Sequence, residues 1–599
     1  MTAQLFGDAG SLAAPRVTRE DLPGGGFVLR SADALQPHVR RVGDWLEHWA
    51  LTTPDAPFLA ERDGTGGWRR LNYAQVRQQV GRIAQALLEW RIDARRPVVV
   101  LSDNSLDHAL LVLAAMHIGR AACSVSSAYC RLTKDYGKVK GILDALRPGL
   151  VYASDPTVYA APIRAWGGDA RLVFGRDAGA FPGALPFADL LAAGETPAVM
   201  QAFAAIQPDD HAKYLLTSGS TGTPKVVINT HRMLTANQQQ MAQVWPFLSR
   251  HRLNLLEWLP WSHTFGANHN FNMALAHGGA IHIDDGRPAP GLIDKTVANL
   301  REVKPNFYFN VPRGFDMLLP FLEQDEALAR DVFERLEGVF YAGAALPQSV
   351  WERLEGVARR VRQRPLWFTS SWGATETSPA ITSVHWRIDR AGCIGAPLPG
   401  IELKLVPNAG KLEMRVRGPT VFPGYRDAPE LTRTAFDEDG YYLIGDAGKL
   451  VDEADPSAGV SFDGRVAEDF KLMSGTWVSV GTLRLRAISA LSPLAADVVV
   501  AGHDREEVGL LVFPSSAALS MTPDEQARRL REGLLAMRAS GGGSSQTPTR
   551  ALLLNEPPGA DAGEITDKGY VNQRAVLARR AAAVLALYAP VADARVVRV

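Results

Sequence analysis

Residues 214–231 read Tyr-Leu-Leu-Thr-Ser-Gly-Ser-Thr-Gly-Thr-Pro-Lys-Val-Val-Ile-Asn-Thr-His. A short apolar run leads into a loop of hydroxyl side chains and glycines, and residues 226–228 after it have the pattern of a strand. Glycines let the backbone approach a ligand closely, hydroxyls donate to phosphate oxygens, and a lysine adds a mobile cation. The loop therefore predicts a phosphate-binding site made by Thr217, Ser218, Gly219, Ser220, Thr221, Gly222, Thr223 and Lys225.

Two other interpretations of this loop fit the residues less well. A Walker A loop would need glycine at position 224 and Ser or Thr after Lys225, where this chain has Pro224 and Val226. A flexible Ser/Gly linker is the other alternative, but a linker needs no buried strand on both of its sides.

The order of residues from Thr217 to Lys225 resembles the signature loop of the adenylate-forming superfamily. That superfamily includes acyl- and aryl-CoA ligases, luciferases and the adenylation domains of peptide synthetases. The resemblance implies that the chain binds ATP and Mg²⁺ and activates a carboxylic acid as an acyl-adenylate.

Composition limits the class of protein. The 599 residues exceed what one core usually holds, and 46% of them are hydrophobic, so two or more domains are expected. Basic and acidic residues balance at 64 each, which gives no reason to expect a nucleic-acid partner. Three cysteines without CxxC spacing favour a reducing compartment. The first residues lack a signal-peptide pattern and no apolar run is long enough to span a bilayer, so we expect a cytoplasmic protein.

Continuous apolar runs alternate with helical spacing along most of the chain. Val98-Val-Val-Leu101 followed by an apolar helix over 106–118 is typical of a parallel βα unit. Similar strands are expected at 150–152, 281–283, 307–311, 338–342 and 366–369. Residues 1 to about 40 are interpreted as an extended arm, and the apolar positions between Trp45 and Trp90 follow helical spacing.

From about residue 400 short strands predict a small antiparallel β unit, and after Gly464 a separate α+β region begins. We therefore predict an α/β fold: a large N-terminal domain of parallel-sheet subdomains with a small β unit, residues 1–464, and a smaller mobile α+β domain, residues 465–599.

A second polar segment follows the strand expected at 366–369. Its residues 372–376, Trp-Gly-Ala-Thr-Glu, resemble the family's aromatic-Gly-x-Thr-Glu motif. The resemblance implies that Trp372 and Gly373 border the adenine, that Thr375 lies at the α-phosphate, and that Glu376 holds Mg²⁺, for which a carboxylate oxygen is suited. Gly343 and Ala344, after the strand at 338–342, are predicted nucleotide contacts. A helix start is the alternative interpretation of the Thr-Glu pair.

Further residues match the family's motifs in order. Asp446 matches the aspartate that accepts both ribose hydroxyls, Arg465 the arginine at the same ribose, and Lys568 the cation that enters the site during adenylation. Lys471 and Gly475 match the loop that lines the thiol tunnel after the small domain rotates. At the hinge the family's Asp or Lys is replaced by Ala467, so the usual polar hinge contacts are missing or moved.

The segment Leu259-Pro-Trp-Ser-His-Thr-Phe265 resembles the family's Pro-x-x-His segment, which implies that His263 shapes the acid-binding site. The spacing of the histidines at 263, 269, 277 and 282 fits no zinc motif. No aspartate stands near His263 to hold an amino group, which disfavours an amino-acid substrate.

The resemblance covers about residues 42–580 and implies an ATP-dependent carboxylic acid:CoA ligase that acts as a monomer or homodimer. The segments at 258–271, 309–315, 475–480 and 564–573 look most like those of bacterial feruloyl-CoA synthetases. Aromatic rings at Trp261, Phe265, Tyr308 and Phe309 are candidates to enclose a planar hydroxycinnamate, with core packing as the alternative. A fatty-acid or other aryl-acid ligase and an inactive nucleotide-binding family member remain open, whereas a hydrolase has no GxSxG or HExxH motif.

Overall fold

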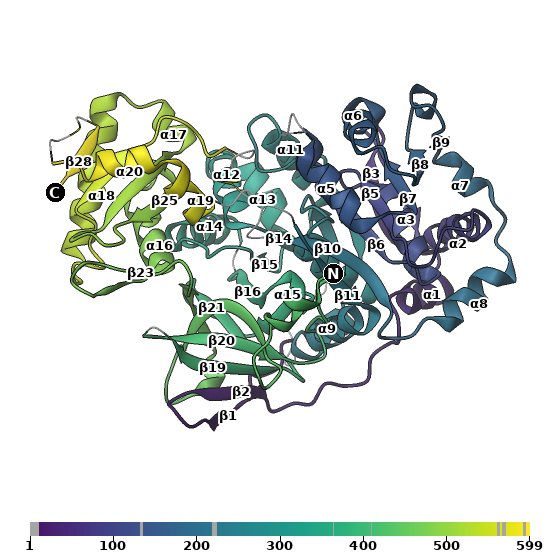
Figure 1. Cartoon of the computed structure of the whole chain (residues 1–599), viewed down its shortest axis with the longest axis horizontal. Coiled ribbons are helices and arrows are strands. Elements are labelled where there is room, and N and C mark those ends of the chain that lie inside the picture. The colour runs from purple at the N-terminus through teal and green to yellow at the C-terminus, as the bar shows by residue number, and fades with distance from the viewer. Residues whose placement is uncertain are drawn as a thin grey trace.

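The computed structural model describes residues 11–131, 136–217, 224–362, 364–408, 410–559, 563–565, 571–590, 593 and 595–599. The chain runs from a large body built of three sheets to a smaller α+β region at its carboxyl end (Figure 1). This arrangement confirms the predicted α/β fold with a large N-terminal and a smaller C-terminal part.

The first sheet of the body has seven strands in the order β11-β10-β6-β5-β7-β8-β9. Side chains on neighbouring residues of β5 enter two different cores: Val98 and Val100 pack with α2 and α3, and Val99 and Leu101 pack with α5 and α6. Both faces are therefore covered, which explains why the strand is apolar throughout. The strands are β5 Val98–Leu101, β6 Ala122–Val125, β7 Leu150–Ala153, β8 Arg171–Phe174, β9 Leu185–Pro186, β10 His211–Thr217 and β11 Lys225–Thr230. The helices around it are α2 Tyr73–Glu89, α3 Leu106–His117, α4 Ala128–Arg131, α5 Gly137–Leu146, α6 Pro156–Trp166, α7 Ala188–Ala192, α8 Pro197–Ala205 and α9 His231–Val244.

The second sheet has four strands in the order β12-β13-β3-β4. Its hairpin of β3 (Pro57–Arg62) and β4 (Trp68–Asn72) lies between α1 (Gly43–Thr52) and α2, so the prediction of continuous helical spacing from Trp45 to Trp90 was wrong. The Asp-Gly-Thr-Gly-Gly sequence at 63–67 forms the turn of this hairpin, because glycines there take left-handed φ values. The other members are β12 Asn254–Glu257 and β13 Ala280–Ile283.

The third sheet has eleven strands and joins a parallel part to an antiparallel part. Strands β14 to β16 are parallel to one another, and β17 to β22 continue antiparallel from β16. The predicted N-terminal arm adds two strands to its far edge, because β2 pairs with β19. Its strands are β1 Val17–Asp21, β2 Phe27–Ser31, β14 Phe307–Asn310, β15 Gly338–Tyr341, β16 Trp367–Gly373, β17 Ala380–Ser383, β18 Cys393–Pro397, β19 Glu402–Asn408, β20 Lys411–Arg417, β21 Tyr442–Leu450 and β22 Val460–Arg465. Helices α10 Asn272–Ala276, α11 Ile293–Val303, α12 Pro312–Gln324, α13 Glu326–Phe333, α14 Gln348–Val361 and α15 Pro429–Arg433 complete the body.

The carboxyl-terminal region has its own core, distinct from those of the body. A two-stranded hairpin, β23 Phe470–Lys471 and β24 Trp477–Val478, precedes a four-stranded sheet of β25 Ala495–Ala501, β26 Gly509–Pro514, β27 Arg550–Leu553 and β28 Val596–Arg598. Its helices are α16 Val480–Ala490, α17 Ser516–Leu519, α18 Pro523–Ala539, α19 Gln573–Arg579 and α20 Ala581–Leu587.

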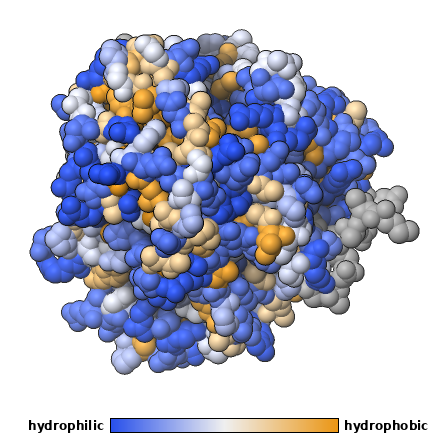
Figure 2. All heavy atoms as spheres, turned by 90° about the vertical axis from the view of Figure 1, so that its right-hand side faces the viewer, coloured by the Kyte–Doolittle hydropathy of each residue, from blue (hydrophilic) through white to orange (hydrophobic). Residues whose placement is uncertain are grey.

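The surface of the protein is mixed. The face shown in Figure 2 is mostly hydrophilic, and its hydrophobic residues lie in small separate groups. None of the helices in the described ranges combines the length and the apolar character that a membrane crossing requires.

Candidate active site

The ends of the parallel strands β14 to β16 place the second polar segment beside the antiparallel part of the third sheet. Gly343 follows β15 with φ of +84°, a conformation that favours glycine. Gly373 closes β16, and a Cβ there would collide with the carbonyl oxygen of Pro379. The chain then turns into the short helix η4 (Thr375–Thr377), so Trp372, Thr375 and Glu376 project from one bend.

Three of the residues predicted to contact adenine and ribose meet across this sheet. The indole nitrogen of Trp372 donates to Asp446 Oδ2 at 2.9 Å. Asp446 pairs in register with Arg465 on β22, and the Arg465 Nε atom lies 3.5 Å from Asp446 Oδ1. The antiparallel pairing of β21 with β22 brings Asp446 to Arg465, and Trp372 reaches them from β16 of the same sheet.

Asp446 keeps one oxygen available for a ligand. Burial raises the pKa of this carboxyl group, and Arg465 and the Trp372 indole oppose that rise. Its Oδ1 atom is buried and accepts no hydrogen bond from any described residue. A carboxylate oxygen in this state is a suitable acceptor for a hydroxyl group of a bound ribose.

Glu376 and Lys225 are linked through one tyrosine. The Tyr425 hydroxyl donates to Glu376 Oε1 at 3.0 Å, and Lys225 Nζ lies 5.0 Å from the centre of the Tyr425 ring. β11 is held against this segment because Val227 forms a bridge with Tyr425 and the Arg426 amide donates to the Val226 carbonyl at 2.9 Å. The end of the predicted phosphate loop therefore lies beside the predicted metal ligand. Residues 218–223 of that loop lie outside the described residues.

The surroundings of Glu376 fit a hard divalent cation. The side chain is buried, and Tyr425 contacts only one of its two carboxylate oxygens among the described residues. Mg²⁺ binds through one or two protein carboxylates together with phosphate oxygens, so a single buried glutamate beside a phosphate loop is an adequate donor set.

Two asparagines connect the loop strand to Thr375 and were missed by the sequence analysis. Asn229 Nδ2 donates to the Thr375 carbonyl at 3.3 Å, and Asn229 Oδ1 accepts from Asn268 Nδ2 at 2.7 Å. The same amide of Asn268 contacts Thr264 Oγ1 at 3.2 Å. Both asparagines are fully buried. Asn229 stands within the opening stretch of sequence, but only its burial indicates that it has a role beyond ending a strand.

His263 begins a tight turn that leads into a π-helical segment, η3 (Phe265–Phe271). The His263 carbonyl accepts from the Ala267 amide at 2.9 Å. A Cβ at Gly266 would lie 2.5 Å from the Leu259 carbonyl oxygen, so this turn requires glycine. π-helical turns occur frequently at functional sites because the wider turn redirects side chains.

The four aromatic residues considered for the acid pocket separate into two groups. Phe265 and Phe309 lie together with Phe340 in the main core, and Trp261 packs edge-on against Phe271. Tyr308 points to the opposite face of β14, into the second core with Phe315. Adjacent residues of a strand point to opposite faces, so Tyr308 and Phe309 do not line the same pocket. The inclusion of Tyr308 with the other three was wrong.

Among the described residues beyond Arg465, Lys471 and Gly475 have no hydrogen bond or ion pair with this cluster. Lys471 Nζ lies 5.0 Å from the centre of the Trp477 ring, and Gly475, with φ of +80°, forms the turn between β23 and β24. Lys568 lies outside the described residues. Its segment is flanked by an antiparallel bridge between Ile565 and Val571 and by a double hydrogen bond from Arg580 to Glu564.

Near the predicted hinge, polar contacts gather at Asp469 and not at Ala467. Lys411, on β20, forms an ion pair with Asp469 and donates to Ser479 Oγ at 2.9 Å. Asp469 Oδ1 accepts from the Val480 amide at 2.9 Å, which caps α16. Ala467 contributes only its carbonyl, which accepts from Arg574 Nη2 at 2.9 Å.

Comparison with known proteins identifies the family. A family model described as AMP-binding enzyme matches residues 46–426, and a model described as AMP-binding enzyme C-terminal domain matches residues 481–592. The chain belongs to the AMP-binding enzyme family. The resemblance to adenylate-forming enzymes in the sequence is thereby confirmed.

The curated relatives of this AMP-binding enzyme are distant. They include a malonate–CoA ligase from Arabidopsis thaliana, 26% identical over 60% of both chains, and a probable CoA ligase, CCL8, from Humulus lupulus, 25% identical over 61% of both chains. The aligned part therefore spans about three fifths of the length of these relatives. A 4-coumarate–CoA ligase from Oryza sativa subsp. japonica is 26% identical over 67% of this chain and 72% of its own.

Solved structures show the same fold at lower identity. ATP-bound MatB from Rhodopseudomonas palustris is 22% identical with a TM-score of 0.69, covering 90% of this chain and 99% of its own. The A-PCP didomain of a carboxylic acid reductase from Segniliparus rugosus, in complex with AMP, is 20% identical with a TM-score of 0.74. The match covers 93% of this chain and 83% of that one.

Proposed function

We propose that this AMP-binding enzyme is an ATP-dependent carboxylic acid:CoA ligase. In the first step the acid's carboxylate oxygen attacks the α-phosphorus of ATP, the bond to pyrophosphate breaks, and an acyl-adenylate forms. In the second step the sulfur of the CoA thiol attacks the acyl carbonyl, AMP leaves, and the thiol proton is released to solvent. The observation that supports this proposal most directly is the meeting of Trp372, Asp446 and Arg465, beside which Glu376 and Lys225 share Tyr425.

Each part of this cluster has a proposed task. Asp446 accepts from the ribose through its Oδ1 atom, which has no hydrogen bond from a described residue and lies beside Arg465, while the Trp372 indole fixes the carboxylate and borders the adenine. Thr375, held by Asn229, faces the α-phosphate, and Lys225 positions the pyrophosphate. Mg²⁺, when bound, neutralises the charge of the triphosphate, and Glu376 is the side chain that would hold it.

The small domain completes the site in this proposal. We place its boundary after Gly464 and assign Lys568 to stabilising the charge that develops at the α-phosphate. After rotation, the hairpin of β23 and β24 with Lys471 and Gly475 would line the path of the thiol. Closing the site would exclude water from a reactive mixed anhydride.

For the acid we propose a hydroxycinnamate such as ferulate. Support comes from the resemblance of residues 258–271 to feruloyl-CoA synthetases and from the 4-coumarate–CoA ligase among the relatives. Trp261, Phe265 and Phe309 supply aromatic surface near His263, which suits a planar ring. His263 would shape the entrance to that pocket.

The test uses the wild-type protein, one variant and four acids. Pyrophosphate release is measured with ATP and Mg²⁺ in the presence of ferulate, cinnamate, benzoate or octanoate, and thioester formation is then measured with free CoA. Ferulate should give the highest kcat/KM, and Asp446→Asn should raise the KM for ATP about 10- to 100-fold because an amide oxygen replaces a charged acceptor. Pyrophosphate release that does not depend on any of the acids would contradict the proposal.

A further inference from the structure

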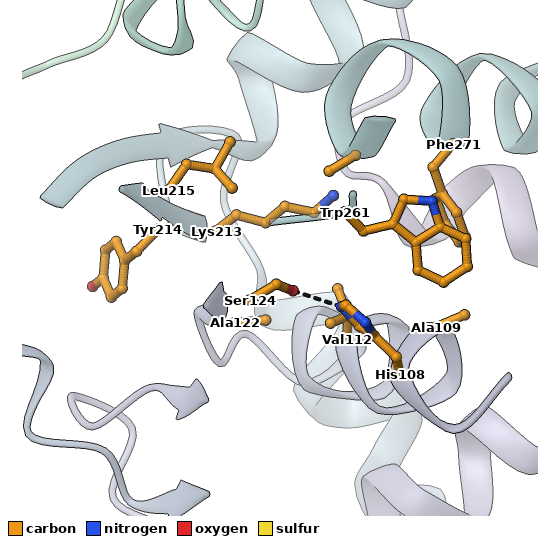
Figure 3. Close-up of a pocket in the computed structure, with 11 residues that line it drawn as sticks. His108, Ala109, Val112, Ala122, Ser124, Lys213, Tyr214, Leu215, Trp261 and Phe271 are labelled. Atoms are coloured by element: carbon orange, nitrogen blue, oxygen red, sulfur yellow. Dashed lines mark hydrogen bonds between the residues drawn. The ribbon is translucent and has the colours of Figure 1, made fainter. Parts of the chain in front are cut away.

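A buried pocket beside the predicted acid site contains a lysine that the proposed reaction does not use. The pocket is lined by α3, β6, β10 and the segment that follows Pro260; its polar members are His108, Ser124 and Lys213. Small side chains at Ala109, Ala122 and Ala267 line a space of about 20 Å³, enough for one group of the size of a water molecule. Figure 3 shows the Lys213 side chain extending past Leu215, with its amino group turned toward Trp261.

Lys213 lacks the partner that a buried cation normally has. Only 5% of its surface is exposed. Within the described ranges of the chain no carboxylate pairs with it, and burial is the sole cause that lowers the pKa of its amino group, to about 7. An isolated buried ammonium group is costly to the fold, and lysines are seldom fully buried without a partner. A bound ligand that supplies an oxygen would offset this cost.

The other two polar groups present hydrogen-bonding capacity to the same space. His108 Nδ1 contacts the Asp103 carbonyl at 3.2 Å, and because a carbonyl can only accept, this nitrogen carries the hydrogen. His108 Nε2 then accepts the hydroxyl hydrogen of Ser124 at 2.7 Å, drawn as the dashed line in Figure 3. Burial lowers the pKa of His108 to about 4, so the imidazole is neutral. The oxygen of Ser124 therefore keeps its lone pairs for a second donor.

Two chain segments link the pocket to the predicted active site. Lys213, Leu215 and Thr217 lie on one face of β10, and Thr217 starts the predicted phosphate loop about 14 Å further along the strand. The Thr217 hydroxyl is buried without a hydrogen bond to any described residue. On the other side, Ala267 of the pocket precedes Asn268, which is joined through Asn229 to the Thr375 carbonyl.

We propose that Lys213 is a specificity-determining residue that holds an oxygen at the end of the substrate remote from its carboxylate. For a hydroxycinnamate this is the 4-hydroxyl group, which would accept from Lys213 and donate to Ser124. The inference rests on the proposed function for the reacting carboxylate. Lys213 could bind the second carboxylate of an aliphatic dicarboxylic acid in the same way.

The experiment compares three cinnamates that differ only at the remote end and adds two aliphatic acids. We measure kcat/KM for 4-coumarate, cinnamate, 4-methylcinnamate, succinate and octanoate with the wild-type protein, with Lys213→Met and with Lys140→Met. Lys140 lies on the exposed side of α5, so its substitution makes the same chemical change away from the pocket. Wild type should prefer 4-coumarate to cinnamate and to 4-methylcinnamate by about 10- to 100-fold. Lys213→Met should reduce that preference to less than threefold, and Lys140→Met should retain it.

The outcomes separate this inference from the proposed function. Hydroxycinnamate activation with a preference that survives Lys213→Met would overturn the inference and leave the function intact. Activation of succinate in place of hydroxycinnamates, lost in Lys213→Met, would overturn the hydroxycinnamate assignment and support the role of Lys213. Activation of octanoate alone would overturn both. If Lys213→Met does not fold, equal wild-type activity on 4-coumarate and 4-methylcinnamate still overturns the inference, because the methyl group fills the same space without an oxygen.

Discussion

Lys411 and Lys213 are both withdrawn from solvent, yet their surroundings differ. Lys411 lies between the large body and the small domain and contacts Asp469, Asp463 and Ser479. Lys213 lies inside the large body, where no described carboxylate pairs with it. The two carboxylates and the hydroxyl around Lys411 offset the cost of burying its charge. Lys213 has no such partners in the described chain, so only a bound ligand could offset that cost. We infer that the first lysine is structural and that the second contacts a ligand.

The same distinction applies to the carboxylates of the candidate site. Glu376 and Asp446 each accept a hydrogen bond on one oxygen, from Tyr425 and Trp372 respectively. The other oxygen of each accepts no hydrogen bond from any described residue, although Arg465 Nε lies 3.5 Å from Asp446 Oδ1. Groups that are half compensated in this way are held in position before any ligand binds.

The largest effect is expected from Glu376. Glu376→Gln should lower the rate of pyrophosphate release about 10²- to 10³-fold, because it removes the charge that would hold Mg²⁺ at the phosphates. Tyr425→Phe removes only the hydrogen bond that orients Glu376 and should cost about 5- to 10-fold. Both rates are measured at saturating ATP, with the exposed Glu438→Gln as the matched control. If Glu376→Gln lowers the rate no more than Tyr425→Phe does, the charge of Glu376 contributes nothing beyond its hydrogen bond with Tyr425. Glu376 is then not the metal ligand.

Lys411 should stabilise the fold. Lys411→Met leaves Asp469 withdrawn from water without its cation, and we expect the unfolding free energy of the small domain to fall by about 3 kcal/mol. Native-state hydrogen exchange of the backbone amides of α16 measures this change. Combining Lys411→Met with Asp469→Asn should recover much of the loss, since the uncompensated charge is then absent. A single variant as stable as wild type would show that this contact does not fix the small domain.

Lys213 should lower the free energy of unfolding, whereas Lys411 should raise it. Burial lowers the pKa of Lys213 from 10.5 to about 7, so between these values the unfolded chain holds a proton that the folded protein does not. Stability should therefore rise with pH in this window by about 1 kcal/mol per pH unit relative to Lys213→Met, and the penalty should be complete below pH 7. Denaturation of both proteins at pH 6.5, 7.5 and 8.5 measures the difference. A difference that is constant over this range would contradict a buried, uncompensated amine.

Measuring the difference between two proteins removes the contributions of neighbouring groups. His108 stays neutral throughout this pH range because burial lowers its pKa to about 4. Burial raises the pKa of Glu257 to about 8, which makes the stability of both proteins fall with rising pH up to that value. Since Glu257 is present in both proteins, its effect cancels.

The sequence predicted the elements whose patterns are local and complete. The run at 98–101 and the helix after it are β5 and α3, because a strand covered on both faces is apolar throughout. The β3–β4 hairpin was missed because its strands are short and carry charged residues, so helical spacing on either side dominated the pattern. The Asp-Gly turn at 63–64 was the available signal.

For the site, motif order named Trp372, Asp446 and Arg465, and the structure brings these three side chains into contact; their contact joins distant segments and had no local pattern in the sequence. Tyr308 was grouped with Phe309 because both are aromatic, although alternation along a strand separates them. The hinge contact at Asp469 and the isolated position of Lys213 depend on tertiary packing. A lysine within an otherwise apolar strand was the one visible sign of the second pocket.

The central claim is that Asp446 and Glu376 hold the nucleotide and that Lys568 of the small domain completes its binding site. The most direct test separates the two half-reactions of Lys568→Ala. Acyl-adenylate formation from ATP and ferulate should fall at least 100-fold, while conversion of preformed feruloyl-adenylate to the CoA thioester should proceed at the wild-type rate. Acyl-adenylate formation by Lys568→Ala at the wild-type rate would contradict the account.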